Sequence, residues 1–289
     1  MNKRIWVNIG LLAFIVLLYS VLTIPDEKDN QELPLLTNID PNKITKIEVI
    51  RSELDDFIFE KQGDAWRMIS PLMLQANNAR INAMLRILKM ESHGQLNSTE
   101  VDLQKFNLAE PAITIKLNDH AFQFGNTDAI DQRRYVLFDN NIHLTNDSLY
   151  AQLTTNAAFF ADPKLLPMNI EINAIQFPDN KIELIDKQWR MQTLVDIKPE
   201  QLKRIAFSWQ EATALSVSKY SAPEDASIIS LSFSSGVTIK FIIVATEPHL
   251  ILGRKDLGIQ YHMGSDEAEK LLLIDPSATN VATESIVPE

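Results

Sequence analysis

The feature that most constrains this chain is a tripeptide, Trp-Arg-Met, that occurs twice at a separation of 123 residues, at Trp66 and at Trp189. In each copy the tryptophan and the methionine are two positions apart, and side chains at that spacing point to the same face of a β-strand. The pattern predicts that Trp66 and Met68 share an apolar face, as Trp189 and Met191 do. Core packing is therefore favoured over an exposed platform on which sugars could stack.

The residues around Trp66 predict antiparallel strands and helices. Short runs that alternate apolar and polar residues are typical of half-buried strands, and they occur at 44–50, 57–61, 65–69, 112–117, 121–124, 134–138 and 142–144. The apolar residues between Ile81 and Leu88 have the spacing of an amphipathic helix, which is expected over 77–90. We expect Asn146 to cap a closing helix that continues through Leu149 and Leu153.

The second half of the chain repeats this order. Strands are expected at 173–177, 181–185, 189–191, 229–233, 237–244, 249–252 and 259–263. A helix can begin at Pro199 and carries apolar residues to Trp209, and Ser265 can cap a last helix with Ala268 and Leu272. Because corresponding residues stay 119 to 123 positions apart, we predict a tandem duplication. The predicted fold class is α+β, with an N-terminal transmembrane helix followed by two tandem repeats, each of antiparallel β-strands packed with two amphipathic helices.

The transmembrane prediction comes from an apolar run that begins at Ile5 and ends at Ile24 and contains no charged side chain. A helix of that length spans about 30 Å, the thickness of a bilayer core. Lys3 and Arg4 precede the run and the acidic stretch PDEKDN follows it, so the amino terminus is expected in the cytoplasm. The alternative is a cleaved signal peptide, for which Ser20 offers only a weak cleavage context.

These observations predict an organisation along the chain. We expect a transmembrane anchor at 1–24, a linker at 25–40, a first repeat at 41–166, a second repeat at 167–275 and a disordered tail at 276–289. The expected location is the bacterial inner membrane, with a single span and the bulk of the chain in the periplasm. The net charge of −11 argues against nucleic acid as a partner. The absence of cysteine excludes disulfides, thiolate metal sites and a lipoprotein anchor.

The first repeat contains several distinctive short motifs: the tryptophan-containing strand with Ser70-Pro71, Phe106-Asn107-Leu108 with Glu110-Pro111, the pair ITIKL and AFQFG, Arg134-Tyr135-Val136, and FADPKLL at 160–166. In this order they resemble domain-of-unknown-function family 4340, a bacterial family. The resemblance covers about residues 40 to 166, and the family usually has glycine where Asn107 stands and an Arg-Asp pair near Ala161. The resemblance implies a cell-envelope accessory protein, similar to auxiliary proteins of gliding-motility-type ABC transporters. Because the family has no established catalytic residues, the resemblance assigns none to this chain.

The residues that could carry chemistry form no recognisable catalytic motif. The chain has five histidines, and none of them has the spacing that predicts a metal site. They are His93, His120, His143, His249 and His262. His143 and His262 fall in corresponding strands, so a symmetric placement is expected. Paired carboxylates could serve acid-base chemistry or bind calcium, although charged turns are usually only solvated; they occur at Glu53, Asp55, Asp56, Asp128 and Asp131. Arg133 and Arg134, before Tyr135, could clamp an anion, although a solvated strand end is the favoured interpretation.

We therefore expect no enzyme, no catalytic, cofactor-binding or metal-binding residues and no cofactor. The favoured hypothesis is a non-enzymatic, membrane-anchored extracytoplasmic accessory module. Its expected partners are the membrane, through the run from Ile5 to Ile24, and an ABC-transporter permease or another envelope protein. The alternative is an extracytoplasmic glycan- or peptide-binding protein, or a hydrolase, that uses a cleft between the repeats, since pockets often form where domains meet.

Overall fold

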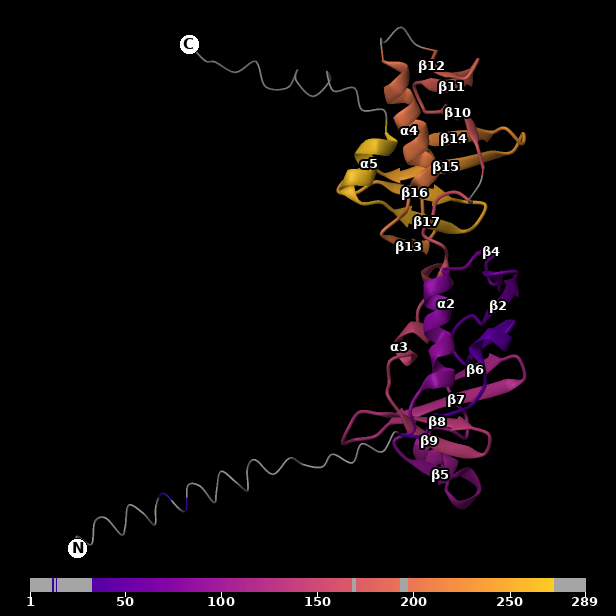
Figure 1. Cartoon of the computed structure of the whole chain (residues 1–289), viewed down its shortest axis with the longest axis vertical. Helices are drawn as coiled ribbons and strands as arrows, with labels where there is room; N and C mark the ends of the chain where they lie inside the picture. The colour runs from indigo at the N-terminus through magenta and orange to yellow at the C-terminus, as the bar shows by residue number, and fades with distance from the viewer. Residues whose placement is uncertain (1–11, 13, 15–32, 168–169, 193–196, 273–289) are drawn as a thin grey trace, which may run out of the picture. The chain divides into compact units, whose positions relative to one another are not determined.

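The computed structural model describes residues 12, 14, 33–167, 170–192 and 197–272. The chain divides into two units, the first ending at Pro34 and the second beginning at Leu35. The second unit contains two antiparallel sheets, one of nine strands and one of eight among the residues described. Figure 1 shows the labelled strands of both sheets and the helices α2 and α4.

The first sheet has the strand order β4-β3-β2-β1-β6-β7-β8-β9-β5. Its strands are β1 (Lys46–Arg51), β2 (Phe57–Gln62), β3 (Ala65–Ser70), β4 (Leu74–Gln75), β5 (Gln95–Asn97), β6 (Ile113–Leu117), β7 (His120–Thr127), β8 (Arg134–Phe138) and β9 (Asn141–Thr145). Apolar and polar residues alternate in most of β1 and throughout β6, and in the sheet these residues are alternately buried and partly exposed. One face of the sheet therefore packs on the core and the other is partly exposed. At the hairpin between β8 and β9, Asp139 and Asn140 both have positive φ, as a two-residue type I′ turn requires.

The second sheet has the order β12-β11-β10-β14-β15-β16-β17-β13. Its strands are β10 (Ile172–Gln176), β11 (Lys181–Ile185), β12 (Gln188–Met191), β13 (Ser216–Lys219), β14 (Ile228–Phe233), β15 (Thr238–Ala245), β16 (Ile251–Arg254) and β17 (Ile259–His262). If β4 is set aside, the strands of the two sheets correspond one to one in this order. The copies of Trp-Arg-Met lie at matching places, on β3 and on β12.

The helices are short, and several have only one turn. They are α2 (Asn78–Leu85), α3 (Tyr150–Leu153), α4 (Pro199–Glu211) and α5 (Ser265–Leu271), with the 3₁₀ segments η1 (Pro41–Lys43), η2 (Arg86–Lys89), η3 (Ser98–Glu100), η4 (Leu103–Phe106) and η5 (Ala157–Phe160). The side chain of Asn77 caps α2 by accepting hydrogen bonds from the amides of Ala79 and Arg80. Figure 1 shows α4 lying against one face of the second sheet, where Trp209 packs 5.4 Å from Phe241, centroid to centroid.

Both tryptophans of the repeated tripeptide face the core, which confirms the interpretation of their spacing. Trp66 is 3% exposed and Trp189 is 9% exposed, and Met68 is fully buried. In the first sheet the core also contains a triangle of aromatic rings, in which Phe57 and Phe59 each lie edge-on to Phe160 at 5.4 and 5.5 Å. Such edge-to-face pairs are favourable beyond the area that they bury.

The predicted fold class is wrong. The described chain is dominated by two large antiparallel sheets with few helices, and not by repeats that combine strands and helices in an α+β manner. The helical periodicity predicts longer helices than the structure contains: the helix expected over 77–90 ends as an α-helix at Leu85, and the closing helix expected from Asn146 is the single turn α3. Three short strands were not foreseen, β4, β5 and β13, and two of them lie at sheet edges in the first sheet and one in the second.

The N-terminal transmembrane helix of the predicted fold receives no support either. Among the residues that the structure describes, no helix is long and apolar enough to cross a membrane. The run from Ile5 to Ile24 lies outside the described residues except for Leu12 and Phe14. The expected linker and tail fall partly or wholly outside them as well, and the domain boundaries stay a prediction.

Candidate functional site

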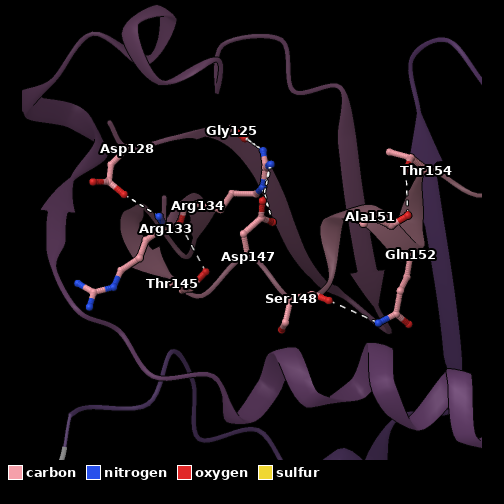
Figure 2. A network of polar contacts seen from close by, with 10 residues as sticks. All are labelled: Gly125, Asp128, Arg133, Arg134, Thr145, Asp147, Ser148, Ala151, Gln152 and Thr154. Atoms are coloured by element: carbon pink, nitrogen blue, oxygen red, sulfur yellow. Dashed lines mark hydrogen bonds and ion pairs between the residues drawn. The ribbon is translucent and has the colours of Figure 1, made fainter. Parts of the chain in front are cut away.

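Arg134, the first residue of β8, lies at the centre of a network of polar contacts (Figure 2). Its guanidinium donates from Nε and Nη2 to the two carboxylate oxygens of Asp147, both at 2.7 Å. Nη1 donates to the backbone carbonyl of Gly125. The guanidinium carbon also lies 3.6 Å from the ring centroid of Tyr150. The side chain is therefore held by an anion, a carbonyl and an aromatic ring, and the expected solvated strand end is wrong for Arg134.

The backbone around Gly125 explains why this motif ends in glycine. A Cβ atom at Gly125 would collide with the backbone carbonyl oxygen of Phe106, so η4 packs directly on β7. The ring of Phe106 lies edge-on to Tyr135 at 4.8 Å. Asn107, which ends η4, has φ of 54° in the left-handed region. Asparagine tolerates that region better than other non-glycine residues, which accounts for its presence where the resembled family usually has glycine.

Asp128 organises the turn between β7 and β8, and Figure 2 shows its side chain beside Arg133. Its carboxylate accepts backbone hydrogen bonds from Ile130 at 3.0 Å, Asp131 at 2.9 Å and Arg133 at 2.6 Å. The bond from the amide of Asp131, followed by the other two amides, holds the pKa of Asp128 below its usual value. Arg133 forms a 3.0 Å ion pair with Asp131. The two carboxylates thus shape the turn, and its tip exposes Ile130, which is 90% accessible.

The acidic turn after β1 is also occupied by internal contacts. The carboxylate of Asp56 accepts the backbone amide of Arg51 at 2.8 Å, and Nε of Arg51 donates to the carbonyl of Asp55 at 2.7 Å. The buried guanidinium of Arg51 lies 3.8 Å from the ring centroid of Phe57, and burial lowers its pKa. Glu53 is exposed. This turn holds a buried arginine, and its carboxylates do not converge on a metal site.

His143 and His262 lie on corresponding strands and each contacts a serine, but their surroundings differ. His143 on β9 contacts Ser92 Oγ through Nδ1 at 2.9 Å, and His262 on β17 contacts Ser218 Oγ through Nε2 at 2.7 Å. Burial lowers the pKa of His143. His93, His120 and His249 lie elsewhere in the chain, and over the described ranges no three or more His, Asp or Glu side chains are grouped to hold a metal ion. A pair of serine-bound histidines in strands fits a structural role.

A cavity of about 440 Å³ opens beside the Arg134 network. Polar and aromatic side chains make up much of its lining, namely Gln104, Asn107, Glu110, Asn126, Arg134 and Tyr150. Asn126 Oδ1 is buried there without a hydrogen-bond partner among the described residues. The motif residues Asn107, Gly125 and Arg134 therefore meet in space at one pocket, where the guanidinium of Arg134 is already bonded to Asp147 and to the carbonyl of Gly125.

Residues 161–165 of the FADPKLL stretch join the two halves of the compact unit. On one side the amide of Asp162 donates to the carbonyl of Gln75 at 2.9 Å. On the other side Leu165 donates to the carbonyl of Ala212 at 3.1 Å, and Ala214 donates to the carbonyl of Pro163 at 2.9 Å. Backbone hydrogen bonds therefore pair this short extended stretch with both halves of the unit.

A cavity of about 680 Å³ lies along this stretch. It has residues of both sheets in its lining, and the charged members are Arg67, Asp162, Lys164 and Arg254. A cleft between the repeats is expected from the sequence, and Arg67, Asp162 and Lys164 stand in two of its motifs, but none of them is predicted to line a cleft. Arg67, the FADPKLL stretch and Arg254 are far apart in the sequence, and no local motif signals that they meet.

Residues 66–186 match a family model described as Domain of unknown function (DUF4340). The family prediction is confirmed for this segment. The matched segment starts at Trp66 and contains η4, Gly125, Arg134 and the FADPKLL stretch. It therefore includes the network of Figure 2 and part of the lining of the 680 Å³ cavity. No curated protein and no solved structure matched the chain. The similarity to auxiliary proteins of ABC transporters stays a prediction.

Proposed function

We propose that this protein is a non-enzymatic accessory module of the cell envelope that acts by binding another protein, with an ABC-transporter permease as the first partner to test. The observation that carries the proposal is how the DUF4340 motif residues are used. Arg134, the most chemically capable of them, has its charge neutralised by Asp147, and one face of its guanidinium is covered by the ring of Tyr150. A residue held in this way shapes a surface and is poorly placed to move protons or attack a substrate.

The other candidate groups support the same conclusion. Asp128 is engaged by three backbone amides, and Asp56 is engaged by the amide of Arg51. General acid-base catalysis needs a group within hydrogen-bond reach of a substrate proton. These carboxylates instead stabilise turns. Rigid turns of this kind can present side chains such as the exposed Ile130 to a partner.

The proposal includes attachment to the bacterial inner membrane through the apolar run from Ile5 to Ile24, with the chain after it on the periplasmic side. Support comes from the length of the uncharged run and from Lys3 and Arg4 before it. Membrane fractionation of the full chain tests this part. A variant that lacks residues 1–24 is expected to leave the membrane fraction, and an unchanged distribution would contradict the attachment.

Partner binding is tested by affinity purification of the tagged full chain from detergent-solubilised membranes after chemical cross-linking. We expect an ABC-transporter permease among the cross-linked proteins, with a yield that falls when Ile130 is replaced by Asp. Leu54→Asp is the matched control, because Leu54 is an exposed apolar residue of a different turn. Recovery of no transporter subunit, from several solubilising detergents, would count against the proposal.

A second candidate function is ligand binding in the cavity of about 680 Å³ along the FADPKLL stretch. The specific observation in its favour is the size and lining of this cavity, which falls in the range of small-ligand sites and combines apolar walls with a few charged groups. No residue of the cavity forms a nucleophile and base pair in the described part of the chain, so the candidate is a binding protein and not a hydrolase.

A further inference from the structure

The cavity along the FADPKLL stretch contains hydrogen-bond donors that the protein leaves unused. Arg67 and Lys164 line it, and neither side chain makes an ion pair or a side-chain hydrogen bond with any residue that the structure describes. Glu60 is the register partner of Arg67 on β2, yet it forms no ion pair with it. Two cationic groups with free donors thus border the same space.

Two further side chains of the lining are buried and still have donor capacity. Arg254 is 8% exposed and uses Nε and Nη2 to bind Asp256, at 2.9 and 2.7 Å, which leaves Nη1 unused. Tyr261 is 3% exposed, and its hydroxyl makes no hydrogen bond within the described residues. Burial raises the pKa of Tyr261 to about 12, so the hydroxyl keeps its proton and remains a donor.

The balance of charge around the cavity differs from that of the whole chain. The chain carries a net charge of −11, whereas the charged lining consists of Arg67, Lys164 and Arg254 against Asp162. The carboxylate of Asp162 already accepts the backbone amide of Lys164 at 3.1 Å. Arg254 has Asp256 as its counter-ion and Lys164 is exposed, so Arg67 is the half-buried cation of the lining that has no counter-ion among the described residues. Such a cation is unfavourable, and an incoming anion relieves that cost through charge-assisted hydrogen bonds.

The walls of the cavity are aliphatic. Leu74, Leu165, Ile239, Leu257 and Ile259 contribute to the lining, with the largely exposed Met73 at the same cavity. The one aromatic side chain, Tyr261, is too buried to offer a ring face to a sugar. Aliphatic walls with a few cationic donors in the lining suit a peptide segment in which an acidic residue has apolar neighbours better than they suit a saccharide.

We propose that this cavity binds a peptide segment that carries a carboxylate flanked by apolar side chains, with Arg67, Lys164, Arg254 and Tyr261 donating to the carboxylate. The proposal rests on the second candidate function and names its ligand class. It is independent of the cross-linking result at Ile130, because that residue does not line the cavity. Failure of either experiment therefore leaves the other proposal standing.

The test measures binding of a fluorescent acetyl-Leu-Glu-Leu amide to the full chain in detergent by fluorescence anisotropy. We expect saturable binding that weakens as salt is raised, and at least about tenfold weaker binding of acetyl-Leu-Gln-Leu amide. Arg67→Gln is expected to lower the affinity for the acidic peptide about tenfold or more. Arg190→Gln is the matched control, because Arg190 has the same place in the second Trp-Arg-Met copy, is exposed and does not line the cavity.

Lys164→Gln provides a second variant, since Lys164 is exposed and its loss should leave folding intact; we expect a several-fold loss of affinity. Thermal melts of all variants separate loss of binding from loss of fold. Equal binding of the glutamate and glutamine peptides, equal loss in Arg67→Gln and Arg190→Gln, or no saturable binding would each overturn the proposal. Displacement of the peptide by galacturonate at a lower concentration than by acetylglutamate amide would overturn the assignment of a peptide.

Discussion

The network around Arg134 yields a prediction whose control is the neighbouring residue. Arg134→Gln removes two charge-assisted hydrogen bonds to Asp147, one hydrogen bond to Gly125 and the stacking on Tyr150. A hydrogen bond to a charged group contributes about 1.5 to 3 kcal/mol, and a cation over an aromatic ring contributes about 0.5 to 2 kcal/mol. These contributions are not additive, and Asp147 is partly solvated once it is unpaired.

We therefore expect Arg134→Gln to lower the free energy of unfolding by about 3 kcal/mol. Arg133→Gln removes one ion pair to the largely exposed Asp131, and such surface pairs contribute about 0 to 1 kcal/mol. Both variants lose one positive charge from the same turn, so their long-range electrostatic effects are matched. The difference between them reports the buried contacts of Arg134.

The assay is urea denaturation of the full chain in detergent, followed by circular dichroism at a β-sheet wavelength and by tryptophan fluorescence. Asp147→Asn and the double variant complete a cycle, in which we expect a coupling of about 1 to 3 kcal/mol between Arg134 and Asp147. If Arg134→Gln and Arg133→Gln lose stability to within about 0.5 kcal/mol of each other, a margin typical of additive surface effects, the network does not stabilise the sheet as argued.

Three further predictions concern the core and one buried histidine. Trp66→Ala and Trp189→Ala should each destabilise the fold by about 3 to 5 kcal/mol, with the larger loss at the more buried Trp66, measured by the same denaturation. Gly125→Ala should cost about 1 to 3 kcal/mol, because the new methyl group meets the carbonyl of Phe106; an unchanged melting temperature would show that η4 can move away. Because burial lowers the pKa of His143 in the folded state, the unfolded state binds more protons as pH falls below about 6.5, so stability should fall there, and His143→Gln should flatten that dependence in melts from pH 8 to pH 5.

The strands of the two sheets could be predicted from the sequence because their alternation records burial directly. The runs at 57–61, 65–69, 134–138 and 181–185 fall on β2, β3, β8 and β11 with shifts of one residue at most. The strands β4, β5 and β13, which the sequence did not predict, show no such alternation of buried and exposed residues. All three residues of β5 are exposed, β4 has only two residues, and β13 lies at a sheet edge. Such strands form because a neighbouring edge is available, which is a tertiary effect.

The wrong fold class has a different physical origin. The helix expected after Asn146 rested on the spacing of Leu149 and Leu153, and both are buried as a helix would have them. Burial alone does not extend a helix, however, and the single turn of α3 places both residues in the core. Short apolar spacings thus predicted which residues are buried, while the length of each helix was set by packing that the sequence does not display.

The partner of Arg134 shows why the site could not be predicted as well as the strands. The sequence places Arg134 at the start of a strand, where an anion clamp or a solvated end are the natural alternatives. Asp147 lies 13 residues further along, beyond β9, and reaches Arg134 because Thr145, at the end of β9, is the register partner of Arg134 on β8. Cross-strand register depends on the hairpin turn and on the core face together, so a contact of this kind follows only from the folded sheet.

The two Trp-Arg-Met copies indicate where specific binding should be sought. Their tryptophans have the same structural role, since each is buried in its own sheet on a corresponding strand. Their arginines have different surroundings, because Arg67 lines the cavity along the FADPKLL stretch and Arg190 is exposed outside it. Selection for the fold alone explains the shared tryptophans but gives no reason for the different surroundings of the arginines. A ligand that uses Arg67 and ignores Arg190 would give such a reason, and the paired variants Arg67→Gln and Arg190→Gln measure that difference directly.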